Sequence, residues 1–403
     1  MFSRVVGDVL RDVMPDRTVE VVNVSTSAIN TYTLVDQLDE VLAMEPDLLL
    51  LYTGHNEYYG ALGVASNERI GRHPGFVHAY LKLQRLKTFL LLRDGFSALQ
   101  RAVAAPLSAD GRTESGTLME RIVAEQTIPF EGDLYQTGLE QFRHNLGHIL
   151  DRAREAGVQV VVGTLASNLR DQPPFISLEN GTDPASPLPP AAAGADEAFA
   201  QARERLQAGD AAEALAQFRR ARDLDALRFR APGAVNQIIL ELTDRYGARV
   251  AHVEQELAAA SPDGIIGGEL MLEHLHPNSE GYFLMGKAFA LALESAGYFG
   301  EASAPEARRD WASYREDMRL TPLDERVAWH RITYLKGGWP FVMDPARRTD
   351  YTRTYTPVSE TDSLAFLVVH RGLAWDKAKV DLADRLARKG NLEQALAEYD
   401  GLH

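Results

Sequence analysis

The residues best suited to chemistry lie in two short segments of the 403-residue chain. The first, Thr53-Gly54-His55-Asn56-Glu57, follows an apolar run and stands at the carboxyl end of a predicted strand. In open α/β sheets the ligand crevice lies outside the carboxyl ends of the strands. The side-chain NH₂ of Asn56 could donate a hydrogen bond to an oxyanion that develops there. Alternatively, Asn56 caps the following helix, a position that asparagine favours.

The second segment, residues 273–278 (EHLHPN), forms a predicted loop just before a helix. A carboxylate at Glu273 can bond one ring nitrogen of His276, fix its tautomer and leave the other nitrogen to act as a base. Two alternatives stay open. Glu273, His274 and His276 could ligate a metal, although no further protein ligand with recognisable spacing is visible. Either histidine could also cap the next helix or fill a half-buried niche.

The elements that must position these segments alternate between strands and helices. Continuous apolar runs predict strands that are buried on both faces, and so a parallel sheet. These runs cover residues 19–25, 47–54, 158–166 and, as a fourth candidate, 249–257. Apolar residues at helical spacing predict helices over 2–13, 34–44, most of 76–150 (with an amphipathic stretch at 80–92) and 276–297.

A linker rich in Pro, Ala and Gly (180–195) precedes a segment with a different, helical pattern. Residues 196–226 predict a pair of helices in which Ala214, Phe218 and Ala221 recur at i, i+4 and i+7. That spacing resembles one tetratricopeptide repeat, where small residues let two helices approach closely. A second copy begins near residue 378, and residues 305–372 between the predicted sheet and this copy predict a short helical connector with some strand.

Composition excludes several classes of protein. The chain has 57 acidic and 42 basic residues, a formal charge of −15, so it has no electrostatic footprint for nucleic acid. The absence of cysteine excludes a disulfide scaffold, a Cys-ligated zinc site and a thiol nucleophile. No apolar run is long enough to span a bilayer and the N-terminus lacks the order of a signal peptide, but the sequence assigns no compartment.

Taken together, the two segments resemble a known family. Gly54-His55-Asn56 and Glu273-x-x-His276-Pro277 resemble blocks III and V of the SGNH (GDSL-like) hydrolases, and residues 23–28 (NVSTSA) resemble block II. The resemblance covers about residues 1–300, and YTGHNEYYGALG and SNLRDQPPF are similar to a subgroup that carries tetratricopeptide repeats. It implies a flavodoxin-like three-layer α/β fold that lacks its first strand, with a helical repeat-like insertion and the start of a C-terminal repeat array.

The resemblance also implies roles for four residues. His276 matches the general base, and Glu273 stands where the family normally has aspartate, which keeps the charge but lengthens the arm by one methylene. Asn56 and the backbone N–H of Ala28 match the two oxyanion donors, with alanine in place of the usual glycine at position 28. No cofactor and no metal are implied.

The nucleophile of this family, a serine after the first strand, has no counterpart here. Gly7-Asp8-Val9-Leu10 is close to the family's GDSL but has valine at the serine position and lies within a predicted helix. Ser3 lies in the same helix, and residues 25–27 match the oxyanion block. We therefore expect Met1 to be an internal methionine or the chain to be a fragment, and we expect the 403 residues alone to be hydrolytically inert.

These inferences divide the chain into five predicted regions. They are the first part of the hydrolase domain (1–179), the linker and helical insertion (180–230), the closing part of the hydrolase domain (231–300), a connector (301–372) and a truncated repeat region (373–403).

The leading functional hypothesis is a serine ester hydrolase that acts on an acyl or acetyl ester of a small molecule, glycan or lipid. The alternative is an interaction or scaffold protein, in which repeats bind a protein or peptide and the hydrolase domain has become inactive. An acyl transferase would use the same residues. No nucleic-acid partner is expected.

Overall fold

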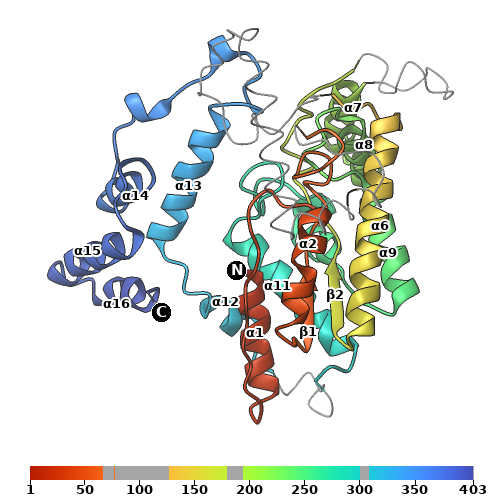
Figure 1. Cartoon of the computed structure of the whole chain (residues 1–403). Helices are drawn as coiled ribbons and strands as arrows, with labels where there is room; N and C mark the ends of the chain where they lie inside the picture. Colours follow the sequence, from red (N-terminus) through yellow and green to blue (C-terminus); the bar gives the residue numbers. More distant parts are fainter. Residues whose placement is uncertain (67–76, 78–126, 179–193, 300–307, 403) are drawn as a thin grey trace, which may run out of the picture. The chain divides into compact units, whose positions relative to one another are not determined.

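The computed structural model describes residues 1–66, 77, 127–178, 194–299 and 308–402. The fold is mixed α/β, mostly helical, with a small parallel sheet (Figure 1). The chain divides into two compact units, which are described separately. Unit 1 comprises Met1–Val24, Ala166–Phe175 and Ala251–His403, and unit 2 comprises Ser25–Leu165 and Ile176–Val250.

The sheet has three strands in the order in which they occur along the chain: β1 (Leu48–Leu51), β2 (Gln159–Gly163) and β3 (Arg249–Ala251). Strands β1 and β2 pair in parallel, with Leu48 opposite Gln159 and Leu51 opposite Val162. A parallel pair requires a long crossover, and the helix α6 (Asp133–Glu155) leads into β2. The parallel sheet and its first two strands were predicted from continuous apolar runs, and both predictions are confirmed.

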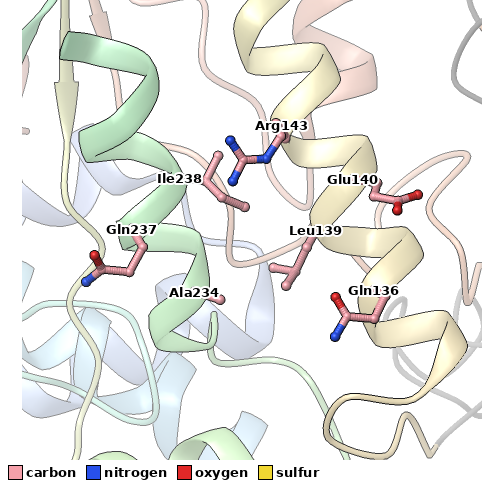
Figure 2. A pocket seen from close by; sticks show the side chains of 7 residues that line it. All are labelled: Gln136, Leu139, Glu140, Arg143, Ala234, Gln237 and Ile238. Atoms are coloured by element: carbon pink, nitrogen blue, oxygen red, sulfur yellow. The ribbon is translucent and has the colours of Figure 1, made fainter. Parts of the chain in front are cut away.

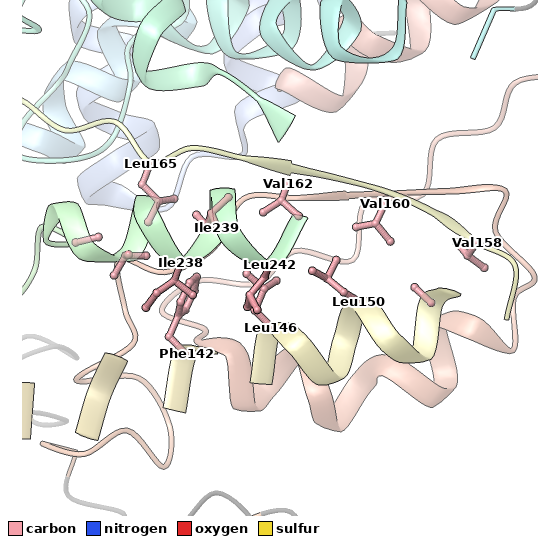
Figure 3. Packing of buried hydrophobic residues seen from close by; sticks show 13 residues of the cluster. Phe142, Leu146, Leu150, Val158, Val160, Val162, Leu165, Ile238, Ile239 and Leu242 are labelled. Carbon is pink, nitrogen blue, oxygen red and sulfur yellow. The ribbon is translucent and has the colours of Figure 1, made fainter. Parts of the chain in front are cut away.

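The core of unit 2 forms where α6 and α9 (Gly233–Tyr246) pack on the sheet (Figures 1 and 3). Helix α6 contributes Phe142, Leu146 and Leu150, spaced so that one face of the helix is apolar. Strand β2 contributes Val160 and Val162, which point to the same side because strand side chains alternate. Helix α9 was not predicted, although Ile238, Ile239 and Leu242 lie at helical spacing.

Two further predicted helical features of unit 2 are present. Helix α2 (Thr31–Leu42) begins three residues before the predicted start, where Asn30 caps it. Helices α7 (Ala195–Gln207) and α8 (Ala211–Leu224) form the predicted helical pair, and Ala214, Phe218 and Ala221 are buried.

In unit 1, the N-terminal helix α1 (Phe2–Val13) packs against α11 (Ser279–Ser295), and both were predicted. The rings of Phe2 and Phe289 stack at 4.9 Å. Gly286 permits the close approach, because a Cβ there would lie 2.5 Å from Cβ of Val5. Helix α10 (Val253–Ala260) and the short 3₁₀ helix η1 (Pro262–Gly264) precede α11 along the chain.

The secondary structure of residues 308–402 consists of helices. They are α12 (Trp311–Glu316), α13 (Pro322–Lys336), η4 (Pro345–Arg347), η5 (Tyr351–Arg353), α14 (Glu360–Arg371), α15 (Trp375–Arg388) and α16 (Leu392–Asp400). The predicted helical character of the connector and the helical pair α15–α16 is confirmed. The strand expected in the connector does not occur in its described part (308–372).

One strand prediction is wrong and another is only partly correct. Residues 19–25 are irregular and exposed, with Val22 61% exposed. A valine-rich run becomes a strand only where another strand pairs with it, and no strand among the described residues does so. The run 249–257 gives only three residues of strand before α10 begins. There Val253 and Leu257 are buried at i, i+4, a helical rather than a strand period.

Other predictions lie outside the described residues. They are the helix at 80–92, most of the helical region 76–126 and almost all of the linker 180–195. No helix in the described ranges is long and apolar enough to cross a membrane.

Candidate functional site

Asn56 lies in a loop that leaves β1 through Gly54. The φ of Gly54 is +139°, and a Cβ there would lie 2.7 Å from Leu165 Cδ1. Only glycine tolerates both that backbone angle and that close packing. The neighbouring His55 is buried, and its Nδ1 accepts a hydrogen bond from the Ala231 N–H at 3.1 Å. His55 therefore anchors the loop, while Asn56 is only half-buried.

Ala28 stands in a second loop of the same unit, just before α2. Its φ is +60°, in the left-handed region that glycine adopts without strain and alanine does not. Two residues on, the buried Asn30 side chain accepts from Thr33 N–H and donates to the Ala61 carbonyl at 2.9 Å. Asn30 thus ties the loop of Ala28 to the loop that carries Asn56.

Glu57 fastens these two loops a second time. Its side chain is 1% exposed and accepts hydrogen bonds from the backbone N–H of Thr31, at 3.2 Å, and from the Thr31 hydroxyl, at 2.6 Å. The Asn145 amide of α6 donates to the same hydroxyl at 2.9 Å. Burial raises the pKa of Glu57 to about 7, although the two bonds from Thr31 oppose the shift.

Glu273 and His276 meet in unit 1, as their spacing predicted. The Glu273 carboxylate is buried, accepts the backbone N–H of His276 at 2.7 Å and contacts Nδ1 of the same residue. A proton on Nδ1 is then held by the carboxylate, so the neutral ring carries its lone pair on Nε2. The His276 side chain is 54% exposed. Partial desolvation by the surrounding protein nonetheless lowers the pKa of His276, which favours the neutral form that a general base requires.

His274 shares the same carboxylate. Its N–H donates to Glu273 Oε2 at 2.7 Å, and its Nδ1 contacts that oxygen. The ring is buried edge-on between Phe175, at a centroid distance of 5.3 Å, and Phe341, at 5.5 Å. His274 is therefore the buried partner of the carboxylate and His276 the accessible one.

The loop that presents this pair is held at both ends. The Leu272 N–H donates to the His276 carbonyl at 2.8 Å, and Asn278 caps α11 by accepting from the Gly281 N–H at 3.0 Å. Gly281 lets the loop lie against the helix, because a Cβ there would lie 2.5 Å from the Leu270 carbonyl oxygen. The position of His276 is thus fixed by backbone bonds within the loop.

The structure brings the predicted residues together in two pairs. Asn56 and Ala28 occupy loops of unit 2 that Asn30 and Glu57 join, and Glu273 contacts His276 in unit 1. Residues 52–66 form turns and no helix, so within the described residues Asn56 does not cap a following helix. Sequence reasoning missed Glu57 and Thr31, although a carboxylate next to the candidate oxyanion donor was a visible signal.

A separate hollow of about 290 Å³ lies between α6 and α9 of unit 2 (Figure 2). Leu139, Ala234 and Ile238 form its apolar part, and none of the predicted site residues lines it. Among the described residues, no group of three or more His, Asp or Glu side chains could hold a metal ion.

Comparisons with family models, curated proteins and solved structures find no match to this chain.

Proposed function

We propose that the chain is an ester hydrolase of the SGNH type, in which Glu273 and His276 supply the acid–base pair and Asn56 and the Ala28 N–H supply oxyanion donors. The observation that carries the proposal is the contact of Nδ1 of His276 with the buried carboxylate of Glu273, with the ring itself partly open to solvent. In this role Nε2 takes the proton of an attacking hydroxyl, and the carboxylate stabilises the imidazolium that forms.

The second pair supports the same proposal. Asn56 follows a parallel strand at its carboxyl end, where ligands bind in sheets of this class. The left-handed backbone at Ala28 supports the match to a family position that usually holds glycine. Two donors aimed at an oxyanion contribute about 3 kcal/mol each to stabilisation of the transition state. The proposal assigns no nucleophile and no individual ester.

The test uses the product of the complete open reading frame, whatever its extent, because no nucleophile is assigned within the 403 residues. Hydrolysis of short-chain p-nitrophenyl esters and labelling by a fluorophosphonate are measured for the wild type and two variants. His276→Ala should lower kcat by about 10²–10⁴-fold, and Asn56→Ala by about 10²-fold. His252→Ala, an exposed histidine outside the loop, is the control.

Full activity of His276→Ala would contradict the assignment of the base. Loss of activity on addition of a chelator would favour the metal-ligand alternative for Glu273, His274 and His276. Transfer of the acyl group to an added alcohol at the expense of water would identify an acyl transferase that uses the same residues.

A scaffold function is the second candidate, and one observation favours it. Helix α16 exposes Leu392 (68%), Leu396 (60%) and Tyr399 (37%) at i, i+4 and i+7, an apolar stripe of the kind by which repeat helices bind a neighbour. Capture of a peptide partner that is lost in Leu392→Ser/Leu396→Ser, with no esterase activity in the complete product, would establish this function instead.

A further inference from the structure

The helical part of unit 1 contains a hollow that the proposed function does not use. Its volume is about 420 Å³. Its lining includes Arg331 and Tyr334 of α13, Thr352 of η5 with its capping residue Asp350, and His370 and Arg371 of α14.

The charge of this hollow is positive. Arg331 and Arg371 are exposed, and in the described ranges neither guanidinium forms an ion pair. The lining carboxylate, Asp350, is already engaged by the N–H and hydroxyl of Thr352 and by Arg353 at 3.4 Å. The last turn of a helix favours cations, which accounts for a basic residue at Arg371 but not for Arg331 in the middle of α13.

A chain of hydrogen bonds that begins at the buried Asp362 and His330 ends at the wall of the hollow. Nε2 of His330 lies 3.0 Å from Asp362, and its Nδ1 lies 2.7 Å from the Tyr351 hydroxyl, which donates to the His330 carbonyl at 3.2 Å. The Tyr351 oxygen then accepts from Nε2 of His370 at 2.7 Å. Burial opposes ionisation of Asp362, but hydrogen bonds from Arg326, the Val358 N–H and Tyr355 lower its pKa to about 2. The chain therefore starts from a fixed negative charge.

This order of donors leaves one nitrogen of His370 uncommitted. With Nε2–H directed to Tyr351, the neutral ring has its lone pair on Nδ1 and can take up a proton there without disturbing the chain. Burial, followed by the charges of His330 and Arg371, lowers the pKa of His370, and Asp350 opposes the shift. The phenols of Tyr334 and Tyr351 complete the ionisable groups around the ring. An anion placed beside the ring would raise the pKa of His370.

We propose that this hollow binds a phosphate group. Two guanidinium forks can each donate two hydrogen bonds to phosphate oxygens, and a protonated His370 adds a further donor. A single carboxylate would need only one fork, so two arginines and a histidine fit a dianion better. The phosphate could be free or carried by a phosphorylated side chain, and the chemistry of recognition is the same.

The test is a titration of the full chain with inorganic phosphate, followed by calorimetry and by the ring signals of His370 in NMR. Arg331→Gln and Arg371→Gln should each weaken binding by about tenfold or more, because each removes charge-assisted hydrogen bonds. Bound phosphate should also raise the pKa of His370. Lys336→Gln, which removes an exposed positive charge from the same helix without touching the hollow, should change affinity less than twofold.

A phosphoserine peptide and its unphosphorylated form identify the source of the phosphate. Tighter binding of the phosphorylated peptide than of inorganic phosphate indicates a protein partner, and the reverse order indicates a free ligand. The proposal is overturned if phosphate does not bind, if Lys336→Gln weakens binding as much as Arg331→Gln, or if the pKa of His370 does not move. The NMR measurement on the wild type keeps the test decisive even where a variant fails to fold.

Discussion

Replacement of Glu57 by glutamine should increase the free energy of unfolding of the chain at neutral pH. Glu57 is buried and its pKa rises from 4.5 to about 7 on folding, since burial penalises the charged form. At 1.36 kcal/mol per pKa unit, that shift corresponds to about 3 kcal/mol. The native state binds the proton more tightly than the unfolded state. This group's contribution is therefore complete below pH 4.5 and is lost as the pH rises through 7.

Glutamine reproduces the protonated acid in shape and in hydrogen bonding. Its carbonyl oxygen can accept from the Thr31 N–H, and its NH₂ can donate to the Thr31 hydroxyl, as the acid proton would. That hydroxyl then accepts from both residue 57 and Asn145. Glu57→Gln should therefore match the wild type near pH 4.5 and exceed it by about 3 kcal/mol near pH 8.

Urea unfolding followed by circular dichroism at intervals from pH 4.5 to 8 measures both free energies. Histidines and other groups titrate in the same range, but their effects cancel in the difference between variant and wild type. Burial raises the pKa values of Tyr32 and Tyr58, two phenols that interact with Glu57, still further from this window. Glu40→Gln, which removes an exposed carboxyl from α2, the helix that carries Thr31, is the control. A difference between Glu57→Gln and wild type that stays constant across the pH range would refute the reasoning.

Three other changes test separate parts of the structure by urea unfolding. Ala28→Gly should stabilise by about 0.5–1 kcal/mol, because glycine removes the strain of a positive φ at some cost in chain entropy; a loss of stability would contradict the left-handed backbone. Lys379→Met should destabilise by about 3–5 kcal/mol, because the buried ammonium bonds Thr321, Asp324 and Glu398, and its loss leaves Glu398 buried without a counter-charge; a neutral effect would mean that these acids are solvated. Leu146→Ala should cost about 2–5 kcal/mol through a cavity in the core of unit 2, whereas exposed Leu240→Ala should cost less than about 1 kcal/mol.

The elements that the sequence predicted correctly are those whose signal is local. The apolar face of α1 repeats within twelve residues, and the leucine and valine runs of β1 and β2 are continuous. Residues 19–25 have an equally strong local signal and form no strand, because a strand depends on a partner supplied by another part of the chain. Helix α9 was not predicted, although its signal, Ile238, Ile239 and Leu242 at helical spacing, is also local.

In the candidate site, too, only the local contacts could be predicted from the sequence. Glu273 and His276 are three residues apart, so their contact could be predicted from spacing alone. The bonds of Thr31 to Glu57 and Asn145 span 26 and 114 residues, and nothing local to any of the three residues indicates them. Long-range polar contacts are set by packing of the elements that carry them, so they follow only from the three-dimensional structure.

The glutamate at position 273 is longer by one methylene than the aspartate of the family that the segment resembles. The extra length lets the carboxylate reach the loop backbone. The carboxylate folds back to accept the N–H groups of His274 and His276, both at 2.7 Å, and still contacts Nδ1 of His276. Two backbone N–H donors and Nδ1 of both histidines thus lie against one buried carboxylate. A carboxylate held by two backbone N–H groups keeps its place whether or not either ring is protonated. The longer side chain is therefore compatible with an orienting role, since the loop backbone fixes the carboxylate and the carboxylate fixes the ring.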